Sequence, residues 1–457
     1  MRGFVSMGRN FFQPGGKALT SDAVEASSTV PVTQAARVES LDILRGIAVF
    51  GILMMNITAF GLLFQAYDNP LADGGATGLN LLAYKIINVG FEGTMRGIFS
   101  LLFGAGIVLL TERMEQAGAG LMAAEIHFRR MLWMMLAGII HWTLMLWIGE
   151  ILFAYSLCGM LLFALRKLPV RTHLKIGGIL ILLAALFSVA DHQSVIGAEA
   201  AASSAQQAKT SGAKLTTEQD EAIENWDDVL SHRMPDIEAI QEQRSWHSGS
   251  YGNAVSGQLP DSYRFQWIGA PPGVLFDMIP FMLIGMALLK LGVLGAGLSE
   301  RTYLLMALGG YAIGIPLGIY ELDIVLTDNF SALSASEANQ TYQISRLAMV
   351  IGHLGLLLLF IRSGVFGLLQ RALGSVGQMA LTNYLMQTII CTILFYDFGF
   401  GLGLFGQFER YQLYGVVGTI WLIELVWSPL WLARFRFGPF EWLWRSLTYW
   451  KCQPMRI

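Results

Sequence analysis

Residues 41–64 read LDILRGIAVFGILMMNITAFGLLF and hold only two charged side chains, Asp42 and Arg45, both close to the start. A helix needs about 20 mostly apolar residues to cross a bilayer, and this stretch supplies them. A soluble helix of the same length would normally carry a polar face. The stretch therefore predicts a membrane-spanning helix with its polar end at Asp42.

Nine further stretches have similar length and hydropathy. Together with the first, the predicted spans are 41–64, 91–111, 131–148, 150–166, 174–190, 272–290, 302–320, 343–361, 372–396 and 411–433. Residues 79–90 instead predict a short amphipathic helix that lies at the membrane interface. The sequence therefore predicts an all-α, polytopic membrane helix bundle of about ten transmembrane helices.

The composition of the whole chain supports this fold class. Of 457 residues, 54% are hydrophobic and only 14% are charged, against about 25% charged residues in an ordinary soluble domain. So apolar a chain is not expected to be disordered, fibrous or a nucleic-acid binder. The net charge of −3 adds little, because the placement of charges decides membrane topology.

The positions of Lys and Arg predict the orientation. If the N-terminus is cytoplasmic, 21 of the 30 basic residues fall on the cytoplasmic side, and the loop 321–342 on the other side has none. Positive charge accumulates in cytoplasmic loops, so this alternation favours an even number of spans with both termini in the cytoplasm.

The spans divide the chain into three regions. Residues 1–40 are polar, lack the apolar core of a signal peptide, and are expected to form a disordered cytoplasmic tail. Residues 41–440 form the transmembrane domain, and 441–457 a cytoplasmic tail. The long loop 191–270 inside that domain is interpreted as an external cap over a membrane cavity, with a disordered spacer as the alternative for its first half.

Ionisable residues at membrane depth are expensive, so they indicate function or ion pairs that hold the bundle together. His141 lies eleven residues beyond Arg130 and is therefore deep in a predicted span. Glu150 follows at the turn to the next span, so the two side chains of this hairpin are expected to approach each other. A His with a carboxylate partner is the usual arrangement of a general base. The alternative is a structural His bonded to a backbone carbonyl.

Other polar side chains on several spans can converge only in a polar cavity. The residues predicted for that cavity are Asn56, Asn383, Glu92, Arg96 and Asp277, with Glu92 and Arg96 expected to pair. His353 is a second candidate base. The three Cys and seven His residues show no metal-ligand spacing, and no metal is predicted.

Four stretches resemble the YeiB-like family of bacterial inner-membrane proteins, which carry a domain of unknown function numbered 418. They are LDILRGIAVFGILMMNI (41–57), FSLLFGAG (99–106), RRMLWMMLAGIIHWTLMLWIGEILFAYSLCGMLL (129–162), and the pair GQMALTNYLMQTII (377–390) and FRFGPFEWLWRSLTYWKCQP (435–454). The family usually has Asp where this chain has Glu150, and either residue supplies a carboxylate. The resemblance implies a multi-pass protein of the bacterial inner membrane.

The family is similar to transmembrane acyltransferases such as heparan glucosaminide N-acetyltransferase. The shared part is an Asp-x-x-Arg-Gly run followed by an Asn, matched here by Asp42, Arg45, Gly46 and Asn56. In those enzymes acyl-CoA enters from the cytoplasm, the acceptor sugar lies on the other side, and a His helps to pass the acyl group. This chain has no His between residues 57 and 126, so His141 or His353 would have to supply the base.

The leading hypothesis is an acyl-CoA-dependent acyltransferase that acts on an envelope sugar or exported metabolite. Acyl-CoA, such as acetyl-CoA, would be the co-substrate, and its phosphates would bind at a cytoplasmic rim made of Asp42, Arg45, Arg129, Arg130 and Arg371. His141, oriented by Glu150, would deprotonate the acceptor, and Asn56 or Asn383 would stabilise the oxyanion. The alternatives are a secondary transporter and an assembly factor without turnover. Membrane lipid is an expected partner, nucleic acid is not, and a homo-oligomer stays open.

Overall fold

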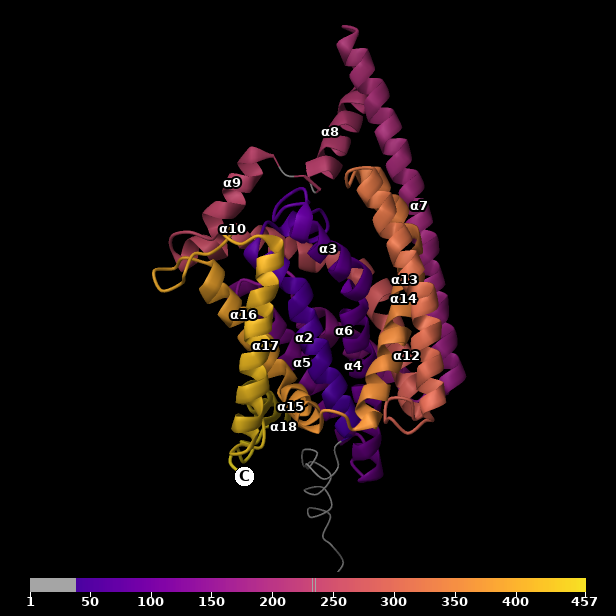
Figure 1. The fold of residues 1–457 in the computed structure, drawn as a ribbon, viewed down its shortest axis with the longest axis vertical. Helices are drawn as coiled ribbons and strands as arrows, with labels where there is room; N and C mark the ends of the chain where they lie inside the picture. Colours follow the sequence, from indigo (N-terminus) through magenta and orange to yellow (C-terminus); the bar gives the residue numbers. More distant parts are fainter. Residues whose placement is uncertain (1–37, 232, 235) are drawn as a thin grey trace, which may run out of the picture.

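The computed structural model describes residues 38–231, 233–234 and 236–457, so the predicted tail at 1–40 lies almost wholly outside the described residues. Within the described part the chain is helical, and the β-structure consists of two isolated bridges, Ser248–Asp397 and Phe435–Arg456. The all-α prediction is therefore confirmed for these residues. The start of α2 and the C-terminus lie at the same end of the molecule (Figure 1).

Among the described residues, seven helical stretches are long and apolar enough to cross a membrane. They are α2 (Glu39–Gly61), α3 and α4 together (Gly78–Gln116), α7 (Val170–Thr210), α12 with its preceding turn (Pro271–Lys290), α13 (Glu300–Thr327), α14 (Ala332–Ser363) and α17 (Arg410–Leu432). An eighth, α15 (Gly367–Gln378) with α16 (Ala380–Phe395), is bent by 83°. The chain is thus a multi-pass membrane protein with seven or eight such spans.

Two of the ten predicted spans correspond to helices that do not qualify by length and composition. Span 131–148 lies in α5 (Met122–Leu144), whose first half carries His127, Arg129 and Arg130. Span 150–166 is α6 (Leu152–Leu165), which is apolar but has only 14 residues. These two helices pack against each other as the predicted hairpin. The predicted interfacial helix at 79–90 is α3 (Gly78–Phe91), which leads into α4 (Thr94–Gln116) through Glu92 and Gly93.

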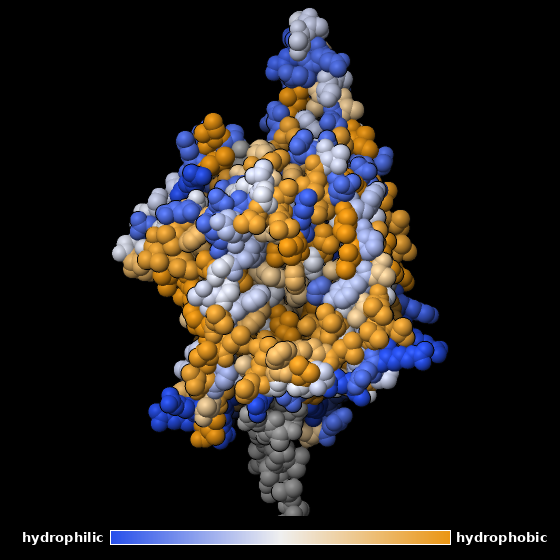
Figure 2. All heavy atoms as spheres, viewed as in Figure 1, coloured by the Kyte–Doolittle hydropathy of each residue, from blue (hydrophilic) through white to orange (hydrophobic). Residues whose placement is uncertain are grey.

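The region predicted as an external loop is mostly helical. Helix α7 continues to Thr210, so the first half of the loop is a helix and the spacer alternative is wrong for residues 191–210. The chain returns along it as α8 (Thr217–Ser231) and passes through α9 (Ile237–Trp246) and α10 (Tyr251–Arg264). Figure 1 shows α7 and α8 projecting from the end of the bundle opposite the C-terminus. Figure 2 shows apolar side chains over the middle of the visible face and hydrophilic ones at that tip and at the lower rim.

The segment that enters the membrane after α10 has an unusual backbone. Two π-helical turns, η3 (Phe265–Gly269) and η4 (Val274–Met278), flank the short α11 (Ala270–Gly273) before α12 (Ile279–Lys290) begins. π-Helical turns widen a helix and are frequent at functional sites. Here they place Asp277, in η4, on the wall of a cavity at the centre of the bundle.

The centre of the bundle depends on close contact between α4 and α12. A Cβ atom at Gly104 would collide with the carbonyl oxygen of Met282, and one at Gly285 would collide with that of Leu101. Such reciprocal small residues let two membrane helices pack backbone to backbone. This crossing fixes α4, which carries Arg96, against the segment that carries Asp277.

Candidate functional site

A central cavity of about 520 Å³ lies among α2, α4, α7, α14 and the π-helical segment. This volume falls within the roughly 300–1,000 Å³ of small-molecule sites. Five residues predicted from sequence line it: Asn56, Glu92, Arg96, Glu150 and Asp277. The prediction that polar groups from several spans converge on one cavity therefore agrees with the structure for these five residues.

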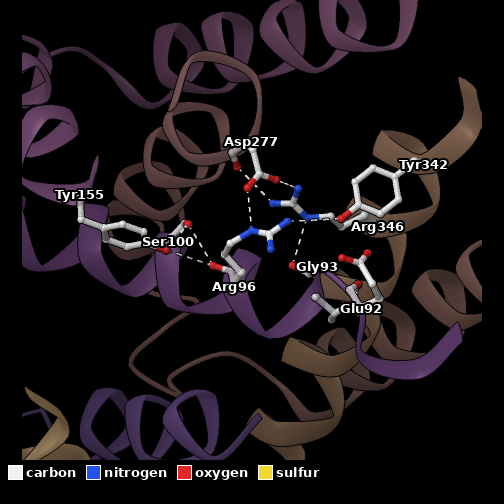
Figure 3. Close-up of polar contacts among 9 residues, drawn as sticks. Glu92, Gly93, Arg96, Ser100, Tyr155, Asp277, Tyr342 and Arg346 are labelled. Atoms are coloured by element: carbon white, nitrogen blue, oxygen red, sulfur yellow. Dashed lines mark hydrogen bonds and ion pairs between the residues drawn. The ribbon is translucent and has the colours of Figure 1, made fainter. Parts of the chain in front are cut away.

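Asp277 holds two arginines at the wall of the central cavity. Arg96 Nε donates to Asp277 Oδ2 at 2.7 Å, and the Arg346 guanidinium lies against Oδ1. Arg346 also donates to the carbonyl oxygens of Gly93 and Asp277, both at 3.1 Å. Figure 3 shows the two guanidinium groups next to each other, both directed at the carboxylate. Because Arg346 is almost fully buried, this network fixes α4, α14 and the π-helical segment relative to one another.

The sequence predicted a different partner for Arg96. It was expected to pair with Glu92 one turn away on the same helix, yet its salt bridge runs to Asp277, 181 residues distant. The reason is the break between α3 and α4: Glu92 lies before the first residue of α4, and Gly93 has a φ of 62°. Arg346 was not assigned to the site, although an arginine inside the predicted span 343–361 was a usable signal.

His141 and Glu150 lie together in the interior, both with fully buried side chains. His141 Nδ1 is 3.6 Å from Glu150 Oε1, and its Nε2 is 2.9 Å from the Thr388 hydroxyl. Glu150 accepts hydrogen bonds from the backbone N–H groups of Leu152 and Phe153, so it also caps the start of α6. The pair is close because His141 is in the last turn of α5 and Glu150 precedes α6. His141 itself lines neither of the cavities next to it.

A second cavity, the basic cavity, has a volume of about 260 Å³ and lies toward the end of the bundle where α2 starts. Its charged lining consists of Arg45, Arg113, Arg130, Arg445 and Glu441. Arg130 stacks on Trp444, with its Cζ atom 4.2 Å from the ring centre. Four guanidinium groups against one carboxylate give a cavity suited to an anion.

The one carboxylate of the basic cavity has a structural role. Glu441 lies in α18 (Pro439–Tyr449) and accepts hydrogen bonds from Leu381 N at 2.7 Å and Thr382 N at 3.0 Å, so it caps the start of α16. Burial raises the pKa of the Glu441 carboxyl above its ordinary value. Through these hydrogen bonds Glu441 also holds α18 against the start of α16.

A thin partition separates the two cavities. Ile52 and Ile151 line both of them, and Tyr155 lines the basic cavity while its neighbour Ala154 lines the central one. The Tyr155 hydroxyl is 2.7 Å from the Ser100 hydroxyl and also donates to the carbonyl of Arg96. The His141 ring contacts Tyr384, a residue of the basic cavity, edge to face at 5.1 Å. The His141–Glu150 pair therefore lies beside the partition.

A third cavity of about 570 Å³, the acidic cavity, adjoins the central one. The two share Asp68, Glu92, Asn339 and Tyr342. The acidic cavity is further lined by Asp191, Asp228 and Glu321, with Arg233 and Arg346 as its basic residues. A positively charged molecule would be favoured in the acidic cavity.

Several predicted site residues lie elsewhere. His353 Nδ1 donates to the carbonyl of Met349 at 3.0 Å, and its ring packs on Phe91 and Tyr311. The Asn383 amide donates to Val376 O and Ser428 Oγ, both at 3.1 Å.

Of the residues predicted for the cytoplasmic rim, some line the basic cavity and others do not. Arg45 lines the basic cavity and pairs with Asp42 at 2.7 Å. Arg130 lines the same cavity, whereas Arg129 pairs with Glu125 on its own helix and Arg371 is exposed on α15. Arg113 and Arg445, which were not predicted, line the basic cavity instead. Only the tertiary structure brings them there. Among the described residues, no group of three His, Cys, Asp or Glu side chains could hold a metal ion.

Comparisons with known proteins agree with this architecture. Residues 288–451 match the family model described as protein of unknown function (DUF418). The chain is 32% identical to the uncharacterized protein YeiB of Escherichia coli K12, over 90% of this chain and 95% of YeiB. It is 31% identical to the uncharacterized protein YxaH of Bacillus subtilis 168, over 94% of this chain and 98% of YxaH. No solved structure matches it significantly. On these similarities, the chain belongs to the YeiB-like DUF418 family of membrane proteins.

Proposed function

We propose that this protein is an acyl-CoA-dependent acyltransferase of the bacterial inner membrane. The acyl group, such as acetyl, would pass to an envelope sugar or an exported metabolite. The observation that carries the proposal is the meeting of two cavities of unlike charge at one thin partition, with the His141–Glu150 pair beside it. Two substrates that arrive from opposite sides of a membrane need such a meeting point.

The basic cavity is the proposed site for the CoA moiety. Its four arginines come from four different helices, α2, α4, α5 and α18. Guanidinium groups bind phosphate through paired, charge-assisted hydrogen bonds. The cavity is also lined by Ile151 and Tyr384, which are apolar or aromatic and suit an acyl-pantetheine arm.

The central cavity is the proposed site for the acceptor. An acceptor hydroxyl or amine would attack the thioester carbonyl carbon across the partition. Its proton would pass to the His141–Glu150 pair, the C–S bond would break, and the CoA thiolate would leave and take up the proton. Glu150 lines the central cavity and His141 lies behind it, so the proton enters the pair from the carboxylate side.

The proposed topology has ten crossings, with both termini and the basic cavity in the cytoplasm. It counts α5 and α6 as two further spans, added to the seven apolar helices and the bent α15–α16 pair. In a Cys452→Ser background, a Cys introduced at Leu144, the exposed last residue of α5, should be labelled from outside by an impermeant maleimide. A Cys at Gly118, at the other end of α5, should be labelled only after permeabilisation. The same sidedness for both positions would contradict the two extra crossings.

A transporter is the second candidate, and one observation weighs against it. An alternating-access transporter exposes its binding site to one side at a time. Here the two cavities coexist in one conformation, on either side of Ile52 and Ile151. Coexisting cavities suit an enzyme that takes one substrate from each side.

The direct test uses purified full-length protein in lipid nanodiscs with radiolabelled acetyl-CoA. The expected result is saturable binding, and slow thioester hydrolysis when no acceptor is added. Arg130→Ala combined with Arg445→Ala should weaken binding at least tenfold, whereas Arg371→Ala, on the exposed face of α15, should not. No binding by the wild-type protein at millimolar acetyl-CoA would refute the proposed function.

A further inference from the structure

The His141–Glu150 pair has a third member on a distant helix. Thr388 Oγ1, in α16, lies 2.9 Å from His141 Nε2, although the two residues are 247 positions apart in the chain. Thr388 is 1% exposed and His141 is fully buried. Buried polar groups are nearly always hydrogen-bonded, and here each of these two groups supplies a partner for the other. The Thr388 hydroxyl therefore belongs to the environment of the pair.

One face of α16 meets the last turn of α5. Tyr384, Thr388 and Thr392 are spaced by four residues, so they share this face. The Tyr384 ring lies edge to face on the His141 imidazole, with centroids 5.1 Å apart. The Thr392 hydroxyl donates to the carbonyl of Met145 at 3.3 Å. These contacts, one turn before and one turn after Thr388, hold its hydroxyl against the imidazole.

The Nδ1 side of the imidazole is occupied by Glu150. Gly138 lies one turn before His141, and a Cβ atom there would be 2.9 Å from Glu150 Oε2 and 2.5 Å from the backbone nitrogen of Phe153. Glycine thus leaves room for the carboxylate and for the start of α6. The backbone N–H groups of Leu152 and Phe153 donate to Glu150 and hold the carboxylate in this position.

Two distances indicate which ring nitrogen carries the proton in the neutral imidazole. A proton on Nε2 has the Thr388 hydroxyl as its acceptor at 2.9 Å. A proton on Nδ1 would have only Glu150 Oε1 at 3.6 Å, which is too long for a hydrogen bond. The hydrogen bond that one nitrogen makes sets the state of the other. The protonated nitrogen is therefore Nε2, and the lone pair of Nδ1 faces Glu150, which lines the central cavity.

We propose that Thr388 is a positioning residue of the acyl transfer, which keeps the proton of neutral His141 on Nε2 and leaves Nδ1 free to accept another. The inference rests on the proposed function. As the acceptor oxygen or nitrogen bonds to the thioester carbon, its proton passes by way of Glu150 to Nδ1. The imidazolium keeps its Nε2–H on Thr388 Oγ1. When the C–S bond breaks, the pair returns the proton to the CoA thiolate, and the neutral tautomer is restored.

The test compares two variants of Thr388 in the full-length protein in nanodiscs, with hydrolysis of acetyl-CoA as the reaction. Thr388→Val keeps the shape of the side chain but removes the acceptor of Nε2–H. General-base catalysis contributes about 100- to 10,000-fold, so a variant that only misplaces the base should lower kcat about 10- to 100-fold, with the Kd for acetyl-CoA within about threefold of wild type. Thr388→Ser keeps the hydroxyl and should restore most of the wild-type kcat.

The matched control is Thr392→Val, one turn further along α16. Its hydroxyl bonds to the carbonyl of Met145 rather than to His141, so this variant should keep the wild-type kcat. A wild-type kcat for Thr388→Val, or an equal loss of kcat in Thr388→Val and Thr392→Val, would refute the inference.

A double variant distinguishes positioning from a packing defect. If Thr388 acts through the His141–Glu150 pair, Thr388→Val should lower kcat little further in a Glu150→Gln background, because residues that act as a unit are not additive. A packing defect would lower kcat by the same factor in both backgrounds. Equal factors would therefore overturn the positioning role.

Two further outcomes separate this inference from the proposed function. If the wild-type protein hydrolyses acetyl-CoA and Thr388→Val is unaffected, the positioning role is refuted and the acyltransferase stands. If the wild-type protein neither binds nor hydrolyses acetyl-CoA, both are refuted. Should Thr388→Val fail to fold, the ¹⁵N shifts of His141 in the wild-type protein decide, with His141→Gln used to assign them. Protonated Nε2 with unprotonated Nδ1 supports the inference, and the reverse refutes it.

Discussion

Arg96 and Asp277 lie 181 residues apart in the chain, yet their side chains form a 2.7 Å salt bridge at the wall of the central cavity. Arg346 reaches the same carboxylate from α14. One acid thus compensates two guanidinium groups at membrane depth, where an uncompensated charge is costly.

Replacing that carboxylate should destabilise the protein. Asp277→Asn removes the carboxylate that contacts both Arg96 and Arg346, and leaves only the Glu92 carboxylate near the two guanidinium groups. Removing one partner of a buried pair costs roughly 3–5 kcal/mol, and partial exposure of Arg96 places the expected loss near the lower end. Thermal unfolding in detergent measures the effect.

The control for this variant is an exposed ion pair. Arg362 and Glu300 lie 3.5 Å apart with side chains 39% and 74% exposed, so Glu300→Gln should cost less than about 1 kcal/mol. An unfolding temperature of Asp277→Asn equal to that of the wild type would show that Asp277 does not hold these helices together.

Substitutions of Glu150 should lower both activity and stability, and two different variants should separate the two effects. Glu150→Ala removes the cap of α6 and should cost about 1 kcal/mol or more. Glu150→Gln keeps an oxygen acceptor but not the charge beside His141, so it should lower kcat about 100-fold or more with a smaller loss of stability. Glu218→Gln, exposed on α8, is the matched control and should behave as wild type. Normal turnover by Glu150→Gln would remove the pair from the proposed mechanism.

Binding at the basic cavity should depend on salt. Exposed and half-buried charges are screened over about 8 Å at physiological ionic strength, so raising NaCl from 50 to 500 mM should weaken acetyl-CoA binding. Arg130→Ala should weaken binding and flatten this salt dependence, because it removes one of four guanidinium groups. Titration calorimetry at several salt concentrations measures both. An unchanged salt slope would place the phosphates elsewhere.

The crossing of α4 and α12 should not tolerate a larger residue. Gly104→Ala would push a methyl group into the Met282 backbone carbonyl, and the helices would have to separate. Overpacking of this kind typically costs about 1–3 kcal/mol. Gly178→Ala is the control: it lies on the exposed face of α7 with nothing within 4 Å of the added atom. Equal unfolding temperatures for the two variants would contradict this account of the contact.

Helices α9 and α10 should loosen at low pH. His247 is stacked between Tyr396 at 4.2 Å and Phe405 at 3.6 Å, and burial lowers its pKa to about 4 from the ordinary 6.5. The unfolded segment therefore binds more protons between these values, so the contact is fully stable above about pH 6.5 and weakens as the pH falls toward 4.

Hydrogen exchange of residues 237–264 at pH 7.5 and pH 5 tests this prediction. Exchange should be faster at pH 5 in the wild type. His247→Phe keeps the ring stack without the titration, so its exchange should show little pH dependence beyond the intrinsic chemical rate. If the wild type and His247→Phe respond equally to pH, His247 is not the cause.

The sequence by itself determined the membrane fold and one local part of the site. Apolar stretches such as 41–64 have no stable position except in a bilayer, so the helical class followed from hydropathy. The proximity of His141 and Glu150 also followed from the sequence, because the two residues are only nine positions apart on either side of one tight turn. The YeiB-like stretches identified the family, which the similarity to YeiB and YxaH confirms.

The tertiary structure decided which distant side chains meet. In a membrane helix both the lipid-facing and the buried face are apolar, so hydropathy does not fix the rotation of one helix against another. For that reason His353, Asn383, Arg129 and Arg371 looked as suitable as Arg96 or Arg130, and only the packing separated them. The Arg96–Asp277–Arg346 network depends on helix crossings, such as the contact of α4 with α12 at Gly104 and Gly285, that no local pattern encodes.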